Sequence, residues 1–469
     1  GGWFDGDKIR FRNGLPERIG GWTRVSNTQI TGTPRKIFDF VTLSSQNLLF
    51  IGTELKVFLE NAGTFNDITP IRSTVTLGSN PVNTTGGAGS GVVTITTQSA
   101  HGAATSDFVT LASLTATDGI TAAQLNTEHQ ITSVPSSTTF TIDTGGSASS
   151  GSTAGGGSSG TAAFQITTGL NTTVLGSGWG AGTWGRFTWG SGAGSLSGQT
   201  LRLWSADNFG EDLIFNIADS TIYYWDATNG TSTRAVELSS LTGASDVPTK
   251  ARKILVSDVD RHCIAFGTNP IGSGTLDPLL IRFSSQEEPQ NWTPSATNTA
   301  GDLRLSKGSE IITAVQTSRQ ILVWTDQSLY SMQFLGPPFT FGVSMLGDNI
   351  RIAGPNTALA VNDVVFWMGQ ENFYLYDGRI QAIPCSVRDY VFGDMNNQQS
   401  FKFHAGSIGS QTEIWWFYVS SGATEVDRYV VYNYGQKVWY YGTLVRTAWN
   451  DRASGLRSFP QATGADFYL

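Results

Sequence analysis

A two-strand phrase recurs along the sequence and constrains the fold more than any other feature. In each copy an apolar run is followed by a short polar or glycine turn and then by an alternating aromatic run, as in LIFNIADSTIYYW. This pattern is typical of a β-hairpin. Six copies begin at Leu48, Leu213, His262, Ile321, Val364 and Glu413. The last five begin 43 to 59 residues apart, which is close to the length of a four-stranded propeller blade, about 40 to 50 residues.

A propeller would also explain why these runs are so apolar. One sheet cannot cover both of its faces, but blades stacked around an axis bury one another. The composition agrees, because 55 glycines, 53 aromatic residues and only 14% charged residues disfavour helices and favour strands with many turns. We therefore predict an all-β protein, a β-propeller of about six blades. A β-sandwich is the alternative, since short strands with frequent turns fit both architectures.

An insertion interrupts the first interval between phrases, which spans 165 residues. Residues 74–165 are poor in aromatic residues and contain short alternating stretches such as GVVTITT and TTFTIDT, which predict a small β module. The module includes the Gly/Ser-rich tract 145–160, which is typical of a flexible linker or of a long loop. We divide the chain into an N-terminal hairpin with the first blade (1–73), the inserted β module (74–165) and the remaining blades (166–469).

Charge and cysteine content limit the classes of function. The net charge of −8 argues against a protein that grips phosphate backbones, because such binding relies on lysine and arginine. No apolar run approaches the length of a membrane helix and the first residues lack a secretory pattern, so we expect a soluble chain. Cys263 and Cys385 stand far apart in the sequence. We expect two buried, reduced thiols rather than a disulfide or a zinc site.

The sequence predicts no catalytic site, no metal site and no cofactor. His101, His129, His262 and His404 are far apart, and none has the spacing of a metal-ligand pair. His101 precedes a glycine in an expected turn, so we place it in a turn or at the surface. No nucleotide-binding glycine motif follows a strand.

A propeller glycosidase is the enzymatic alternative. Asp326, Glu371 and Asp377 each fall in an expected hairpin turn and could supply a pair of acids, but the sequence does not fix their separation. The stretch SADNFGEDL matches only part of the Ser-x-Asp-x-Gly repeat of sialidase blades and occurs once. We therefore expect its Asp207 to form a turn.

Two segments combine residue types that protein interfaces enrich, arginine with aromatic residues and tryptophan with glycine. The first lies at the N-terminus, and the second is GSGWGAGTWGRFTWGSGAG, in which tryptophan recurs every five residues. A surface hairpin and an internal aromatic stack are the respective alternatives. The candidate assembly contacts are Arg10, Arg12, Arg18, Trp22, Trp179, Trp184 and Trp189.

Three stretches of the sequence resemble the tail nozzle proteins of short-tailed bacteriophages, which are also called packaged-DNA stabilisation or tail tubular proteins. They are the opening GGWFDGDKIRFRNGLPERIGGWTRVS, the Gly/Trp repeat, and PFTFGVSMLGDNIRIAGPNTALAVNDVVFWMGQENFYLYDGRIQAIPCSVRDYVF. The resemblance covers the first 70 residues and most of 175–445. The inserted module is similar to small β insertions of phage tail proteins, with VVTITTQSAHG as its marker.

This resemblance implies a structural virion protein of the viral tail rather than an enzyme. Such nozzles are similar to β-propellers that assemble as a homo-hexamer in the host cytoplasm, below the portal and adaptor rings and beside tail fibres or spikes. Their lumen retains the packaged double-stranded DNA and lets it pass, without sequence specificity, at ejection. No small-molecule substrate is implied, and an acidic lumen would repel the DNA phosphates. The alternative is a carbohydrate- or receptor-binding propeller of a phage tail, because tryptophan and tyrosine faces stack on sugar rings.

Overall fold

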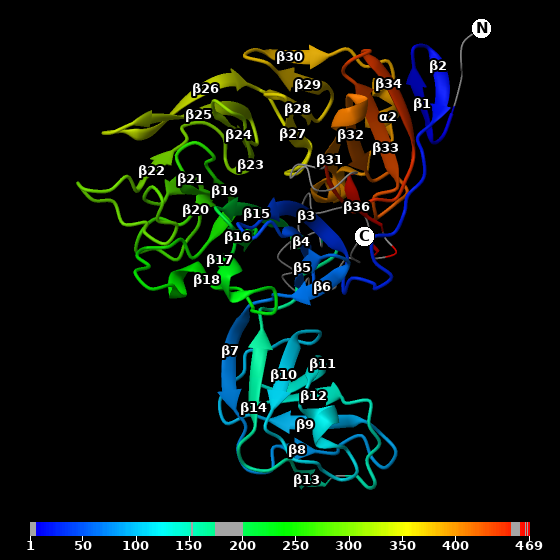
Figure 1. Cartoon of the computed structure of the whole chain (residues 1–469), viewed down its shortest axis with the longest axis vertical. Helices are drawn as coiled ribbons and strands as arrows, with labels where there is room; N and C mark the ends of the chain where they lie inside the picture. Colours follow the sequence, from blue (N-terminus) through cyan, green and yellow to red (C-terminus); the bar gives the residue numbers. More distant parts are fainter. Residues whose placement is uncertain (1–5, 152, 174–199, 452–459, 465, 467) are drawn as a thin grey trace, which may run out of the picture. The chain divides into compact units, whose positions relative to one another are not determined.

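Six four-stranded antiparallel sheets follow one another along the chain and form a β-propeller (Figure 1). The computed structural model describes residues 6–151, 153–173, 200–451, 460–464, 466 and 468–469. The protein is nearly all-β, with 46% strand and 6% helix. The predicted fold class, an all-β propeller of about six blades, is therefore confirmed.

In each blade the strands lie side by side in the order in which they occur in the sequence. Blade 1 contains β3 (Pro34–Val41), β4 (Asn47–Thr53), β5 (Val57–Asn61) and β6 (Thr64–Asp67); blade 2 contains β15 (Trp204–Phe209), β16 (Asp212–Ile217), β17 (Ile222–Trp225) and β18 (Val236–Glu237); blade 3 contains β19 (Ala251–Val256), β20 (Cys263–Thr268), β21 (Asp277–Phe283) and β22 (Gly301–Arg304). Blade 4 contains β23 (Ile311–Gln316), β24 (Ile321–Thr325), β25 (Ser328–Gly336) and β26 (Thr340–Asp348); blade 5 contains β27 (Ala358–Val361), β28 (Val364–Met368), β29 (Phe373–Tyr376) and β30 (Ile380–Ile383); blade 6 contains β31 (His404–Ile408), β32 (Glu413–Tyr418), β33 (Arg428–Asn433) and β34 (Val438–Thr443).

The remaining elements of the propeller unit are short. They are the N-terminal hairpin β1 (Ile9–Arg12) and β2 (Leu15–Arg18), the helix α2 (Arg388–Gly393), the 3₁₀ turns η1 (Ala227–Asn229), η2 (Leu238–Ser240), η3 (Asn397–Lys402) and η4 (Gly409–Gln411), and the C-terminal pair β35 (Ala448–Asn450) and β36 (Gln461–Thr463). Among the described residues no helix has the length and apolar character needed to cross a membrane.

Each recurring phrase of the sequence contains the second and third strands of one blade. These middle strands are covered on both faces by the neighbouring blades, so their side chains need not alternate between core and solvent. In β24 and β32, for example, every residue is buried. The first strands carry more polar and more exposed residues, and of the fourth strands only β34 of blade 6 falls within a phrase.

The first strands of the six blades, together with β35, form a closed inner ring. They contact one another in the order β3, β15, β19, β23, β27 and β31, and β35 contacts both β31 and β3. Among the described residues β35 pairs with β36 alone, so a two-stranded sheet occupies a seventh position between blade 6 and blade 1. The prediction of about six blades did not include this seventh sector.

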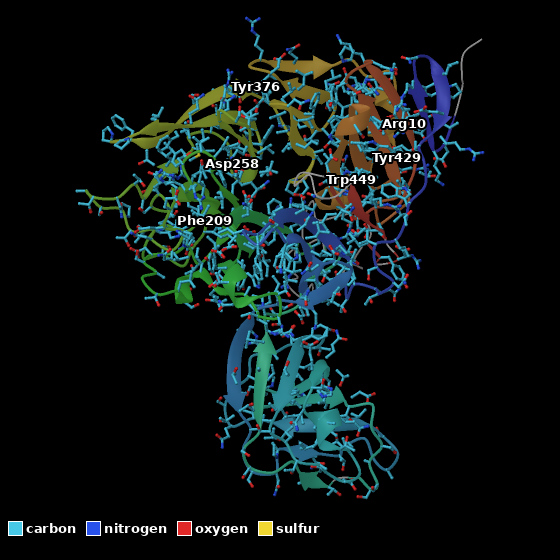
Figure 2. All side chains as sticks on the ribbon, in the orientation of Figure 1. Arg10, Phe209, Asp258, Tyr376, Tyr429 and Trp449 are labelled. Carbon is cyan, nitrogen blue, oxygen red and sulfur yellow. The ribbon has the colours of Figure 1, made fainter. Side chains whose placement is uncertain are left out.

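Trp449 of β35 fixes this seventh sector against blade 6 (Figure 2). Its indole Nε1 donates to the Ser407 carbonyl at 3.0 Å, and its ring stacks on Trp415 with 5.8 Å between the ring centroids. The indole lies directly over Gly406, where an added Cβ would overlap it. Glycine at this position therefore allows β35 to pack against blade 6 and complete the inner ring of strands.

A buried ion cluster joins blade 1 to blade 6. Arg35 of β3 donates from both Nη atoms to the Glu425 carboxylate, at 2.8 and 2.6 Å, and Lys402 Nζ donates to the same group at 3.1 Å. The Arg35 side chain is only 2% exposed. Burial alone would raise the pKa of Glu425, but the hydrogen bonds and charge of Arg35, assisted by Lys402, lower it to about 2.

The inserted segment forms a second unit, Asp67–Gly169 with Arg234–Val236. One eight-stranded sheet runs through it, in the order β13-β8-β9-β12-β11-β10-β14-β7. Its elements are β7 (Ile71–Thr76), β8 (Val82–Asn83), β9 (Val92–Thr96), β10 (Phe108–Ala112), α1 (Ala122–Leu125), β11 (Glu128–Ser136), β12 (Thr139–Asp143), β13 (Ala154–Gly155) and β14 (Thr161–Gln165). Phe140 and Phe164 are fully buried in a hydrophobic cluster that belongs to this unit alone.

The Gly/Ser-rich tract lies inside this unit as a long loop, which is one of the two forms that its composition predicts, and does not link two units. Apart from residue 152, tract 145–160 is described; it contains β13 and places Ala148 in the hydrophobic cluster. Gly156 lies so close to Val82 that a side chain would not fit, and its φ of +100° favours glycine. Small residues in this loop therefore allow close packing against β8.

We expect the Glu425 cluster to make stability depend on pH in the acid range. The folded-state pKa is about 2 against an ordinary value of 4.5, so the stabilisation is complete above pH 4.5 and is lost as the pH falls through about 2. Glu425→Gln should lower the free energy of unfolding by about 3 kcal/mol at pH 7 and by progressively less below pH 4.5. Urea titrations across this range measure the difference. The exposed control Glu371→Gln should change little, and an effect of Glu425→Gln that is the same at every pH would contradict the assignment.

We also expect the propeller to fold without the inserted segment, because that segment has its own sheet and its own core. Replacing residues 70–166 by a short Gly/Ser linker should leave the near-ultraviolet circular dichroism of the buried tryptophans and a single cooperative unfolding transition. Loss of the cooperative transition would show that the propeller depends on the insertion.

Candidate functional site

Arg10, a predicted assembly contact, is used inside its own chain (Figure 2). β1 contacts β34 of blade 6, and Arg10 donates from Nε and Nη2 to the two carboxylate oxygens of Glu413, at 2.7 and 3.0 Å. Glu413 is fully buried, and Trp415 Nε1 donates to it as well, at 3.0 Å. Arg10 therefore balances a buried charge of blade 6 and is only 9% exposed.

The other predicted contacts are placed differently. Arg12 and Arg18 are exposed on the β1–β2 hairpin, where Arg12 lies 3.4 Å from Glu17. Trp22 is 45% exposed and packs edge-on against Trp449. Trp179, Trp184 and Trp189 lie outside the described residues. An assembly role for the exposed residues remains a prediction, and the expected surface hairpin is present at β1 and β2.

The three carboxylates considered for glycoside cleavage lie in hairpin turns, as predicted. Asp326, between β24 and β25, accepts hydrogen bonds from the backbone N and the Oγ of Ser309, both at 2.7 Å. Asp377, after β29, accepts from Gln381 Nε2 at 2.9 Å. Both side chains therefore tie turns to neighbouring segments of the propeller.

Two sequence predictions about polar residues are wrong. His101 is not at the surface, since it is 2% exposed and stacks on Phe164 in the core of the inserted unit. Asp207 is not in a turn but in strand β15, where its carboxylate accepts from the backbone N of Val256 at 2.9 Å. Burial raises the pKa of Asp207 to about 7. His101 does lie in a loop, between β9 and β10, so only its expected exposure is wrong, whereas the turn expected at Asp207 is replaced by a strand.

Both cysteines are free thiols, but only Cys263 is fully buried, whereas Cys385 is partly exposed. Burial raises the pKa of Cys385 to about 11 and also raises that of Cys263. Both therefore stay protonated near neutral pH. Among the described residues no group of three or more histidine, cysteine, aspartate or glutamate side chains could hold a metal ion.

The β25–β26 hairpin of blade 4 exposes apolar side chains at its end. Its strands have nine residues each and extend beyond the rest of their blade (Figure 1). Phe339 is 73% exposed, Leu335 59% and Phe334 39%. The segment 328–347 contains no charged residue. Exposed apolar groups that gather in one place, rather than singly, indicate an interaction surface.

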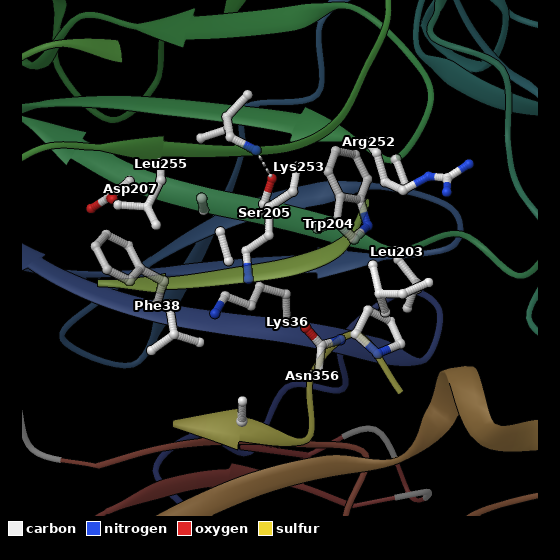
Figure 3. Close-up of a pocket in the computed structure, with 18 of the residues that line it drawn as sticks. Lys36, Phe38, Leu203, Trp204, Ser205, Asp207, Arg252, Lys253, Leu255 and Asn356 are labelled. Carbon is white, nitrogen blue, oxygen red and sulfur yellow. Dashed lines mark hydrogen bonds between the residues drawn. The ribbon is translucent and has the colours of Figure 1, made fainter. Parts of the chain in front are cut away.

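The first strands of blades 1 to 5 contribute to the lining of a cavity of 530 Å³ (Figure 3). Its walls include the side chains of Lys36 and Phe38 from β3, Asp207 from β15 and Lys253 from β19. A second cavity of 260 Å³ shares Lys36 and Lys253 with it. Sequence analysis missed this site, although a repeated tripeptide, RKI, in PRKIF of β3 and ARKIL of β19, could have indicated it.

We expect loss of Arg10 to be strongly destabilising. Arg10→Met leaves the buried Glu413 carboxylate without its cation, which should lower the free energy of unfolding by about 3 to 5 kcal/mol. The matched control Arg12→Met, on the same hairpin but exposed, should cost less than about 0.5 kcal/mol. Chemical denaturation compares them, and the double change Arg10→Met with Glu413→Leu should regain most of the loss. An equal loss of stability in Arg10→Met and Arg12→Met would contradict this account.

No protein-family model and no curated protein matches the sequence. Among solved structures, the computationally designed protein Ika8 is 10% identical with a TM-score of 0.40, over 95% of this chain and 98% of that chain. AztD from Citrobacter koseri is 7% identical with a TM-score of 0.30, over 53% and 73% of the two chains. The phage phi92 endosialidase is 9% identical with a TM-score of 0.23, over 96% of this chain and 66% of that chain. None of these likenesses is strong enough to carry a functional argument.

Proposed function

We propose that this chain is a structural protein of a short-tailed phage tail, the nozzle whose ring continues the DNA exit channel below the portal and adaptor. The proposal rests first on the sequence resemblance in the N-terminal region and in the long stretch that begins PFTF. That stretch starts at Pro338, at the end of the β25–β26 hairpin, and continues through blade 5 to α2. A ring-forming protein needs a surface on each copy that another copy buries.

The exposed end of the β25–β26 hairpin is the observation that supports assembly most directly. Subunit interfaces bury aromatic and aliphatic side chains at their centre and exclude charged residues there. Phe339 and Leu335 meet both conditions, because they are exposed and stand in a segment without charge. Burying two such side chains contributes roughly 3 to 6 kcal/mol to association, enough to decide whether a ring forms.

Two further observations support a structural role. The turn carboxylates Asp326 and Asp377 are engaged by Ser309 and Gln381, so their interactions explain their presence without a bound sugar. The net charge of −8 suits a conduit that must not retain DNA, and we expect acidic side chains to outnumber basic ones on the face toward the ring axis.

The test is the mass of the native protein, alone and with its adaptor. We expect a six-fold ring in at least one of the two conditions, and only monomers when Leu335→Ser and Phe339→Ser are combined. Leu43→Ser is the matched control, because Leu43 is 87% exposed as a single apolar residue in a turn of blade 1, and this variant should assemble like the unchanged protein.

Two results would contradict the proposal. One is a monomer in both conditions, and such a monomer that also binds glycans would favour the carbohydrate- or receptor-binding propeller. The other is a ring that forms equally well with the hairpin variant, which would remove the hairpin from the interface.

A further inference from the structure

Two lysine side chains line the same central cavity, and the proposed function assigns no role to either of them. Lys36 comes from β3 and Lys253 from β19, and the strand between them in the inner ring is β15, which carries Asp207 (Figure 3). Each lysine follows an arginine in the repeated tripeptide RKI. The ring therefore brings together two like charges that are far apart in the sequence.

The preceding arginines form ion pairs, whereas the two lysines form none with a described residue. Arg35 binds Glu425. Arg252 binds Asp219, at 3.1 Å, and Glu310. Lys253 Nζ donates to Thr313 Oγ1 at 2.7 Å, and Lys36 Nζ has no hydrogen-bond partner among the described residues. Neither ammonium group has a carboxylate oxygen of a described residue within 4.0 Å.

The carboxylates that line the cavity do not neutralise both lysines. Asp219 and Glu310 are held by Arg252, and Asp258 is exposed to solvent. Asp207 remains, and the backbone N–H groups of Val256 and Asn208 already donate to its two oxygens. Among the described lining residues the interior of the cavity thus holds two ammonium groups against one carboxylate.

Both lysines are partly buried, and an ammonium group with restricted access to water and no counter-charge nearby is unfavourable. The effect is visible at Lys253, where burial, together with the charge of Lys36, lowers the pKa to about 7. A bound anion would relieve this cost, because it would supply the missing negative charge and accept hydrogen bonds from both Nζ atoms.

The rest of the cavity wall is suited to an apolar body. Phe38, Trp204 and Leu255 form an apolar part of it, while Asn356 and Ser205 are among its polar side chains (Figure 3). A volume of 530 Å³ falls in the range of small-molecule sites, about 300 to 1,000 Å³. We propose that the central cavity binds a small organic anion, with its carboxylate or phosphate group between Lys36 and Lys253 and its apolar body against Phe38, Trp204 and Leu255.

Isothermal titration of the full chain tests this proposal with four probes. Benzoate and phenyl phosphate carry both an anionic group and a ring, inorganic phosphate lacks the ring, and benzyl alcohol lacks the charge. We expect benzoate or phenyl phosphate to bind with a Kd at least tenfold below that of inorganic phosphate, and no detectable binding of benzyl alcohol. Absence of binding for both aromatic anions, or equal binding of benzyl alcohol, would overturn the proposal.

Variants of the lysines locate the binding. Lys36→Met and Lys253→Met should each weaken the bound anion at least tenfold, while Lys36→Arg, which keeps the charge, should retain binding. Lys250→Met removes the same charge from an exposed position just before β19 and should have no effect. Without an anion, Lys36→Met should also unfold at a higher temperature than the unchanged protein. Equal anion affinity for Lys36→Met and Lys250→Met would place the ligand elsewhere and refute the site.

Discussion

The middle strands of every blade are apolar on both faces, and the rest of the structure depends on covering them. A sheet such as β23–β26 cannot satisfy this requirement alone, because the side chains of β24 point to both sides and all are buried. Only a neighbour on each side removes them from water, so the series of blades must close on itself. Closure is therefore a thermodynamic condition of the fold rather than a detail of its shape.

The two ends of the chain meet this condition together. β35 enters the inner ring between β31 and β3, Trp449 packs over Gly406, and the backbone N of Val25 donates to the carbonyl of Leu469 at 2.9 Å. The Arg35–Glu425 pair adds a second link between the first and last blades. A complete seventh blade is not needed, since a two-stranded sheet is enough to cover the facing sides of blades 1 and 6.

The sequence predicted the six repeated hairpins, but it did not predict the features that form only when the ring of blades closes. All six hairpin phrases are the middle strands of blades, because double burial leaves a continuous apolar run that can be recognised without a structure. β35 has only three residues and no such run, so the seventh sector left no signal. Asp207 and His101 were misplaced for the same reason, since each is held by a segment distant in sequence, Asp207 by β19 and His101 by β14, that no local pattern reveals. The cavity lysines, one on β3 and one on β19, also become neighbours only through the ring.

Closure can be measured through native-state hydrogen exchange of the middle strands. In a closed ring, the amides of Ile51 in blade 1 and Phe417 in blade 6 should exchange as slowly as that of Val323 in blade 4, through global unfolding alone. If the blades instead belonged to an open or two-layered arrangement, the first and last blades would have an exposed face. Markedly faster exchange in both end blades than in blade 4 would then contradict the account.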